Sequence, residues 1–210
     1  YTTLFRSGIT DFVLSPGSRN APLSIALYEA EARGLIDLHV RIDERTAAFF
    51  ALGITKATKH PAVAICTSGT AVANYYPAFL EAHHSDLPLI IISADRPARL
   101  RGTGANQTTN QINLFNCGRF FSNENYELHA DGPTHINLEF DEPLLSDDKD
   151  DWLKDLTGTV KQPTAPTSSS LQTAYASLDN FKAISDTIIY NPAQFKPLFG
   201  AKAAPELRAR

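Results

Sequence analysis

Short apolar runs alternate with helical patterns from Asp11 to about Phe140. The predicted strands are residues 12–14, 38–42, 62–66, 87–93 and 135–140. Between them, apolar side chains recur at every third or fourth position, which predicts helices at residues 22–33, 44–56 and 71–83. Runs that are apolar on both faces are typical of a parallel sheet covered by helices. The pattern therefore predicts an α/β fold in which helices flank a parallel β-sheet.

The chain changes character beyond about Asp141. The stretch LSDDKDDWLKD is acidic, and KQPTAPTSSS has the Pro, Ser and Thr content of a linker, which cannot build a core. Pieces such as SDTIIY follow, but they form no complete unit. We therefore predict one domain at residues 1–145, a linker at residues 146–170, and a fragment of a central α/β domain at residues 171–210.

Composition narrows the function classes. Hydrophobic residues make up 43% of the chain and charged residues 20%, which is ordinary for a globular protein, so no membrane span is expected. The net charge of -4 argues against a general nucleic-acid binder, because phosphate neutralisation needs a surplus of Lys and Arg. The two cysteines, Cys66 and Cys117, are too few for a disulfide framework and have no metal-type spacing to histidine. We therefore predict a cytoplasmic protein and no metal ligands in this chain.

Three predicted strand ends are followed by loops of unusual composition. These loops are SPGSRNAP (residues 15–22), TSGTAVANYYPA (residues 67–78) and SADRPARLRGTGANQ (residues 93–107). In an open parallel sheet, ligands bind beyond the carboxyl ends of the strands, where the three loops would meet. Taken alone, each loop is explained as a tight connection that needs Gly and Pro. The three together favour a ligand site.

Arginines in these loops suggest an anionic ligand, because a guanidinium group pairs with carboxylate or phosphate in a fixed fork. Arg19 and Arg96 are the favoured candidates, since they directly follow predicted strands. A surface position explains Arg99 and Arg101 at least as well. Gln107 adds a neutral hydrogen-bonding group to the third loop.

Acidic residues stand at the start of the second predicted helix. Asp43 is placed to cap that helix, and Glu44 in its first turn would interact favourably with the helix dipole. This structural explanation accounts for an acidic residue, but not for Glu in particular. The helix that begins near Thr70 follows a Gly-containing turn, whose free N–H groups could bind an anion or a polar ring edge.

The loops and helix starts, in this order and spacing, resemble those of one enzyme family. The matching segments are SPGSRNAPL, RIDERTAAFFALG, AICTSGTAVANYYPA, SADRPARLRGTGANQT and the later GPTHINLEFDEPL. They resemble the N-terminal domain of the 2-succinyl-5-enolpyruvyl-6-hydroxy-3-cyclohexene-1-carboxylate synthases, a family of thiamine diphosphate enzymes. The resemblance covers residues 4–145 and implies a pyrimidine-binding domain for thiamine diphosphate.

The resemblance also implies roles for individual residues. Glu44 would hydrogen-bond N1′ of the aminopyrimidine ring and promote the tautomer that activates C2. A carboxyl group buried against that ring is suited to sharing the proton, since desolvation raises its pKa. Four residues would lie in loops near the pyrimidine ring: Pro16, Thr67, Thr70 and Asn74. Four others match positions around isochorismate and its carboxylates: Ser18, Arg19, Arg96 and Gln107.

For the family, the implied reaction is a transferase step of menaquinone biosynthesis. Carbon dioxide is lost from 2-oxoglutarate, and the remaining carbanion adds to isochorismate in a conjugate addition. Mg²⁺ or Mn²⁺ and the diphosphate are held by another domain with a Gly-Asp-Gly motif, which this chain lacks. Family active sites form between subunits, which implies a homodimer or homotetramer. We therefore expect the isolated chain to be inactive.

Two features suggest that the sequence is part of a longer protein. The opening YTTLFRSGITDF is typical of a helix already under way, and the interval from Phe115 to Gly132 is shorter than in the family. We expect ordered pieces of a longer chain, which an intact-mass measurement would check.

Two other functions fit parts of the pattern. Another thiamine diphosphate lyase or decarboxylase, such as an acetolactate-synthase relative, would keep Glu44 but would not need Arg19, Arg96 and Gln107 together. A non-catalytic α/β module that binds a carboxylate would use Glu44 only as a helix-start residue.

Overall fold

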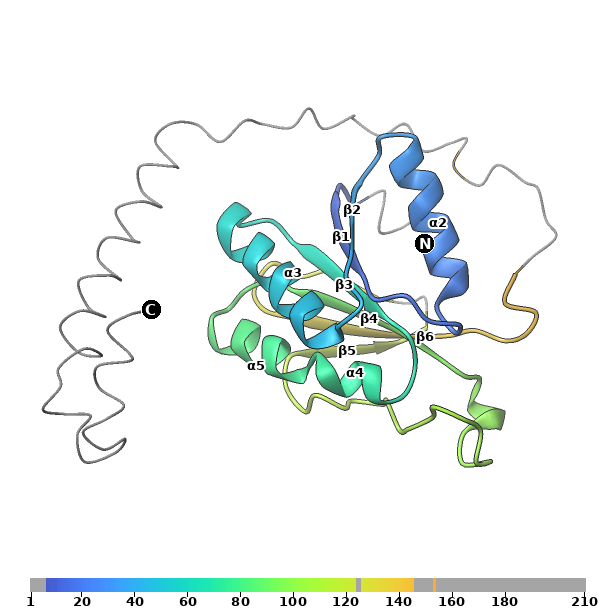
Figure 1. Ribbon diagram of the computed structural model, residues 1–210. Coiled ribbons are helices and arrows are strands. Elements are labelled where there is room, and N and C mark those ends of the chain that lie inside the picture. The colour runs from blue at the N-terminus through green and yellow to red at the C-terminus, as the bar shows by residue number, and fades with distance from the viewer. Residues whose placement is uncertain (1–6, 124–125, 146–152, 154–210) are drawn as a thin grey trace, which may run out of the picture. The chain divides into compact units, whose positions relative to one another are not determined.

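The computed structural model describes residues 7–123, 126–145 and 153 (Figure 1). The chain divides into two units, Tyr1–Lys161 and Gln162–Arg210, and the described residues all belong to the first. The predicted linker, except Leu153, and the predicted fragment at residues 171–210 lie outside the described residues. The predicted domain boundaries therefore stay predictions.

Six parallel strands form a single sheet at the centre of the described unit, in the order β2-β1-β3-β4-β6-β5. The strands are β1 (Asp11–Leu14), β2 (Asp37–Val40), β3 (Ala62–Cys66), β4 (Ile90–Asp95), β5 (Arg119–Ser122) and β6 (Thr134–Glu139). All residues of β3 and β4 are buried, as the continuous apolar runs predict for central strands of a parallel sheet. The predicted parallel sheet is confirmed.

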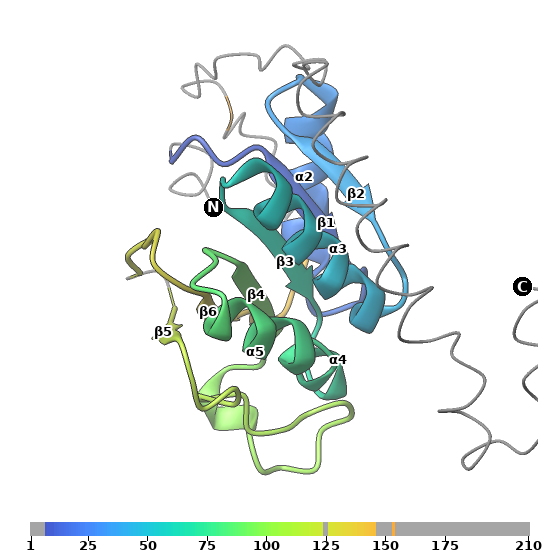
Figure 2. The same ribbon diagram turned by 90° about the vertical axis from the view of Figure 1, so that its left-hand side faces the viewer.

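Helices cover both faces of the sheet. They are α2 (Ala21–Ala32), α3 (Glu44–Thr58), α4 (Thr70–Asn74) and α5 (Tyr76–His84), with a 3-10 turn at Ala98–Leu100. Helix α2 packs on one face, and α3, α4 and α5 pack on the other (Figures 1 and 2). Leu23 and Leu27 of α2 join a core with Ile65 and Ile92, whereas Phe79 of α5 belongs to the opposite core. The predicted α/β fold with flanking helices is therefore confirmed.

Three local predictions were wrong. The single helix predicted at residues 71–83 is two helices that meet at Tyr75, because Pro77 has no N–H to continue the helical hydrogen bonds. The strand predicted to begin at Leu87 begins at Ile90, since Leu87 N–H bonds Ala82 O and Leu89 N–H bonds Leu87 O. Strand β5 was not predicted at all; it is a short edge strand with half-buried side chains.

Because all six strands are parallel, the loops after β1, β2, β3, β4 and β6 leave the sheet at one edge, the carboxyl edge. Two pairs of these loops touch. A Cβ atom on Gly17, after β1, would lie only 2.6 Å from Thr67 Cβ, after β3. Ser68, also after β3, hydrogen-bonds Gln107 of the long loop after β4. The three loops predicted to converge therefore do so. Among the described helices, none is long and apolar enough to cross a bilayer.

Candidate functional site

Glu44 is the first residue of α3 and lies half-buried at the carboxyl edge of the sheet. Asp43 caps the helix as predicted: its backbone is extended, and its Oδ1 accepts a hydrogen bond of 2.9 Å from Arg45 N. Hydrogen bonds from the Arg45 side chain lower the pKa of Asp43 to about 2. Because Asp43 supplies the cap, the Glu44 side chain remains available for other contacts. One of them is with Asn74, whose Nδ2 donates to Glu44 Oε2 over 3.3 Å.

The apolar side of this position holds two weakly acidic groups, Cys66 and Tyr75. Burial raises the pKa of the Cys66 thiol and of the Tyr75 hydroxyl, and the nearby Glu44 charge raises both further. The Tyr75 hydroxyl donates to Ile65 O at 2.9 Å and also contacts Ser15 Oγ at 3.1 Å. Both groups therefore stay protonated at neutral pH.

The loop after β1 is held in shape by Asn20, a buried residue that the sequence prediction missed. Asn20 Oδ1 accepts from Gly17 N at 2.8 Å, and Asn20 Nδ2 donates to Ser15 O at 2.9 Å. With the loop held by these two hydrogen bonds, Pro16 and Ser18 are exposed at the carboxyl edge of the sheet. An Asn just before a helix that begins Ala-Pro was the available signal, since Asn favours turns and helix starts.

Arg96 and Gln107, both predicted site residues, are brought together through Ser68. Arg96 Nη1 donates to Ser68 Oγ and to Gln107 O, each at 3.0 Å. Ser68 Oγ donates to Gln107 O at 2.9 Å, and Gln107 Nε2 donates to Ser68 O at 3.1 Å. We call these three residues the Arg96 cluster. It presents a guanidinium group beside an amide at the edge, where Arg96 is half-buried and Gln107 is exposed.

Arg19 contacts a different segment. Its guanidinium donates to Phe140 O at 3.1 Å and pairs with Glu142 Oε1 at 3.2 Å, and the residue is only 8% exposed. Its hydrogen bonds within the described residues are thus with the segment after β6 and not with the Arg96 cluster. Arg99 likewise pairs with Asp141 of that segment, at the surface.

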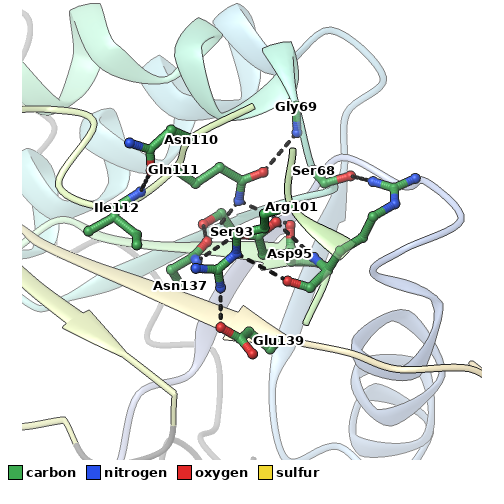
Figure 3. A network of polar contacts seen from close by, with 12 residues as sticks. Ser68, Gly69, Ser93, Asp95, Arg101, Asn110, Gln111, Ile112, Asn137 and Glu139 are labelled. Atoms are coloured by element: carbon green, nitrogen blue, oxygen red, sulfur yellow. Dashed lines mark hydrogen bonds and ion pairs between the residues drawn. The ribbon is translucent and has the colours of Figure 1, made fainter. Parts of the chain in front are cut away.

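A polar network joins β4, β6 and the loop after β4, and Figure 3 shows most of its members. Asn137 Nδ2 donates to Asp95 Oδ2 at 2.9 Å, and Asn137 Oδ1 accepts from Ser93 Oγ at 2.7 Å. Since the Ser93 hydroxyl has given its single proton to Asn137, the 2.8 Å contact with His135 Nε2 must be donated by the imidazole. Arg101 closes the network by pairing with Asp95 at 3.4 Å and with Glu139.

The remaining predicted site residues lie in the loop after β3 and in α4, and of these Asn74 contacts Glu44. Thr67 is buried against Gly17, Thr70 is the exposed first residue of α4, and Asn74 is its last. A half-buried carboxyl group beside an amide and an apolar wall fits an aminopyrimidine ring, whose N1′ shares a proton. The described residues contain no comparable site for a metal ion. Among them there is no group of three or more His, Cys, Asp or Glu side chains that could hold one.

Comparison with known proteins identifies the class. Residues 1–114 match the family described as thiamine pyrophosphate enzyme, N-terminal TPP binding domain, where TPP is another name for thiamine diphosphate. The chain belongs to this family. Its fold and the half-buried Glu44 beside Asn74 agree with that assignment.

Several relatives share one name, 2-succinyl-5-enolpyruvyl-6-hydroxy-3-cyclohexene-1-carboxylate synthase. The relative from a Nocardioides species is 54% identical over 157 residues, which cover 73% of this chain and 28% of the relative. The relative from Saccharopolyspora erythraea is 45% identical over 179 residues, covering 74% of this chain and 32% of the relative. A third relative, from Bacillus velezensis, is 45% identical over 164 residues, which cover 28% of that relative. The chain thus spans about 30% of the length of the relatives it matches. The predicted resemblance to these synthases is confirmed, whereas the roles of single residues stay predictions.

Proposed function

We propose that the protein is a thiamine diphosphate-dependent synthase of menaquinone biosynthesis that uses 2-oxoglutarate and isochorismate. Its reaction would remove carbon dioxide from 2-oxoglutarate and add the remaining four-carbon unit to isochorismate. When bound, thiamine diphosphate supplies the electron sink that such a decarboxylation needs. The observation that carries the proposal is the half-buried Glu44 carboxyl group at the carboxyl edge, hydrogen-bonded by Asn74. The name shared by the relatives supports the choice of substrates.

On the cofactor side, the Glu44 carboxyl group would give a proton to N1′ of the aminopyrimidine ring and later accept it again. Asn74 would orient the carboxyl group, because its amide donates to one of the two carboxylate oxygens. Pro16, Thr67 and Thr70 would bound the ring from the loops after β1 and β3.

On the substrate side, Arg96 and Gln107 would bind a carboxylate of isochorismate. In the described part of the chain, only Nη1 of the Arg96 guanidinium takes part in hydrogen bonds, so its other N–H groups can meet an anion. Ser18 lies exposed at the same edge and would add a hydroxyl group. Arg19 would contribute either directly or by holding the segment after β6, to which it is bound.

The remaining components of the proposed site come from outside the described residues. Mg²⁺ and the diphosphate would be held by residues elsewhere in the protein, because the described part offers no cluster of metal ligands. We further propose a homodimer or homotetramer in the cytoplasm, in which a second subunit completes the site. The isolated chain would then be inactive.

Product formation tests the proposal. Protein expressed from the complete reading frame is given thiamine diphosphate, Mg²⁺, 2-oxoglutarate and isochorismate, and the product is identified by mass spectrometry. The proposal expects one adduct of isochorismate for each carbon dioxide released. Carbon dioxide released without any adduct would favour another thiamine diphosphate decarboxylase instead. Binding of carboxylates with no turnover would favour a non-catalytic module.

A further inference from the structure

Gln111 is fully buried, with 0% of its surface exposed, yet its side-chain amide is bonded to three parts of the fold (Figure 3). Oε1 accepts a hydrogen bond of 2.8 Å from Gly69 N, in the loop after β3. Nε2 donates to Ala94 O in β4 at 3.2 Å and to Asn137 Oδ1 in β6 at 2.7 Å. The amide orientation is fixed by these partners, since Gly69 offers only a donor and the other two offer acceptors.

The backbone that Gln111 holds is in direct contact with Gln107. Gly69 has φ of +81°, a conformation that favours glycine, and a Cβ atom there would lie 2.8 Å from Gln107 Cγ and O. The preceding residue, Ser68, exchanges two hydrogen bonds with Gln107. Any shift of Gly69 must therefore displace Gln107, because no free space separates them.

Arg96 depends on the same backbone. Its Nη1 is bound to Ser68 Oγ and Gln107 O, the two groups that face each other across the contact. A continuous chain of contacts thus runs from Asn137 in β6 through Gln111 and Gly69 to the Arg96 cluster. Gln111 is its central link.

We propose that Gln111 is a positioning residue for the acceptor substrate: it holds the Ser68-Gly69 backbone so that Arg96 and Gln107 meet a carboxylate of that substrate. The inference rests on the proposed function, in which the acceptor is isochorismate. Gln111 acts through Gly69 and does not touch the substrate, because its side chain is sealed from the surface. On the cofactor side, Glu44 and Asn74 share no hydrogen bond with Gln111 among the described residues. Thr67 and Thr70 adjoin the Ser68-Gly69 backbone, so Gln111 affects the cofactor side only through these two neighbours.

Two substitutions separate positioning from bulk stability. Gln111→Met keeps the length of the side chain but removes all three hydrogen bonds. Gln111→Asn keeps the donor and the acceptor of an amide on a side chain shorter by one methylene, and guards against a Met variant that fails to fold. Asn110→Ala is the matched control. Asn110 is the neighbour of Gln111 in the sequence, its side chain is exposed, and in the described part of the chain it bonds only Ile112 N.

The experiment measures KM for isochorismate, KM for 2-oxoglutarate and thiamine diphosphate affinity in protein from the complete reading frame. Amide hydrogen exchange at Gly69 is followed in parallel, without substrates. We expect Gln111→Met to raise KM for isochorismate at least tenfold and to speed Gly69 exchange about tenfold. KM for 2-oxoglutarate should stay near the wild-type value, and cofactor affinity should fall less than the use of isochorismate does, since Thr67 and Thr70 adjoin the Ser68-Gly69 backbone. Gln111→Asn should recover part of the slow Gly69 exchange and part of the lost affinity, and Asn110→Ala should match the wild type.

Three outcomes would contradict the inference. If the wild-type protein is active and both Gln111 variants keep the wild-type KM for isochorismate, the positioning role of Gln111 is wrong. The proposed function is not affected by that result. Equal losses for both substrates and the cofactor show that Gln111 is merely a core residue. Wild-type protein that forms no adduct of isochorismate overturns the proposed function and with it the named acceptor, whatever Gly69 exchange shows.

Discussion

Asn74 Nδ2 donates a hydrogen bond of 3.3 Å to Glu44 Oε2, which joins the end of α4 to the start of α3. The donor satisfies one carboxylate oxygen, and within the described part of the chain the other oxygen accepts no hydrogen bond. A hydrogen bond to a charged group contributes about 1.5 to 3 kcal/mol when buried, and less at this half-buried position.

If this contact orients Glu44 toward the cofactor, Asn74→Ala should weaken thiamine diphosphate binding about fivefold, a loss of about 1 kcal/mol. Titration calorimetry with Mg²⁺ present measures the effect. Thr46→Ala is the control and should bind as the wild type does, because Thr46 lies in the same first turn of α3 and its hydroxyl donates to Asp43 O, its one hydrogen bond among the described residues. Unchanged affinity in Asn74→Ala would show that Asn74 does not serve the cofactor.

Arg96→Ala should raise KM for isochorismate tenfold or more, because it removes the guanidinium group of the Arg96 cluster. Charge-assisted hydrogen bonds of this kind contribute about 1.5 to 3 kcal/mol. Affinity for thiamine diphosphate should stay nearly intact. Arg99→Ala is the control, since Arg99 is exposed and paired with Asp141. Equal losses of isochorismate use and cofactor binding would mean that Arg96 is structural.

Arg19→Ala should lower the free energy of unfolding by about 1 to 2 kcal/mol, because it removes a buried side chain that bonds Phe140 O. The ion pair with exposed Glu142 adds little, since solvent screens it. Urea unfolding measures the difference, with Arg99→Ala as a control expected within about 0.5 kcal/mol of the wild type. A wild-type unfolding free energy together with lost isochorismate binding would assign Arg19 to the substrate instead.

His135 predicts a pH dependence of stability. Burial lowers its pKa to about 3, against 6.5 in the unfolded chain, so only the unfolded chain takes up the proton between these values. This contribution to stability is complete above pH 6.5 and is lost as the pH falls, by about 1.4 kcal/mol per pH unit.

His135→Gln removes the titration while keeping an N–H donor for Ser93. Between pH 6.5 and pH 5 the wild type should lose about 2 kcal/mol more than this variant. Urea unfolding at the two pH values gives the comparison, in which contributions from carboxylates cancel. Identical losses in the two proteins would show that His135 is protonated in the folded state.

Local patterns were enough for most of the fold. The run Ala62–Cys66 has the length and continuous apolar character of a central strand, and Asp43 marks the start of α3 by a cap made within two residues. Strand β5 escaped prediction because RFFS is short and its identity depends on pairing with β6. The break at Tyr75 follows from Pro77, which sequence alone could have indicated.

The site was harder, because its contacts join distant parts of the chain. Arg96 directly follows β4, and Glu44 and Gln107 lie in the segments after β2 and β4, on the side where ligands of parallel sheets bind, but their roles rest on the family resemblance and stay predictions. The partner of Arg19, Glu142, is 123 positions away. Gln111 meets Asn137 only because β4 and β6 pair in a register that sets Ser93 opposite Asn137. Such a register depends on the packing of the whole sheet and leaves no local signal.

Glu44 is proposed to exchange a proton with the cofactor, and the variant Glu44→Gln probes this role. The glutamine keeps the size of the side chain and can still contact Asn74, but it cannot hold or return an acidic proton. In protein from the complete reading frame, exchange of the C2 hydrogen of bound thiamine diphosphate for deuterium is measured by quenching and NMR. We expect C2 exchange in Glu44→Gln to be slower than in the wild type by orders of magnitude, with the cofactor still bound. Exchange at the wild-type rate would remove Glu44 from the mechanism and contradict the account.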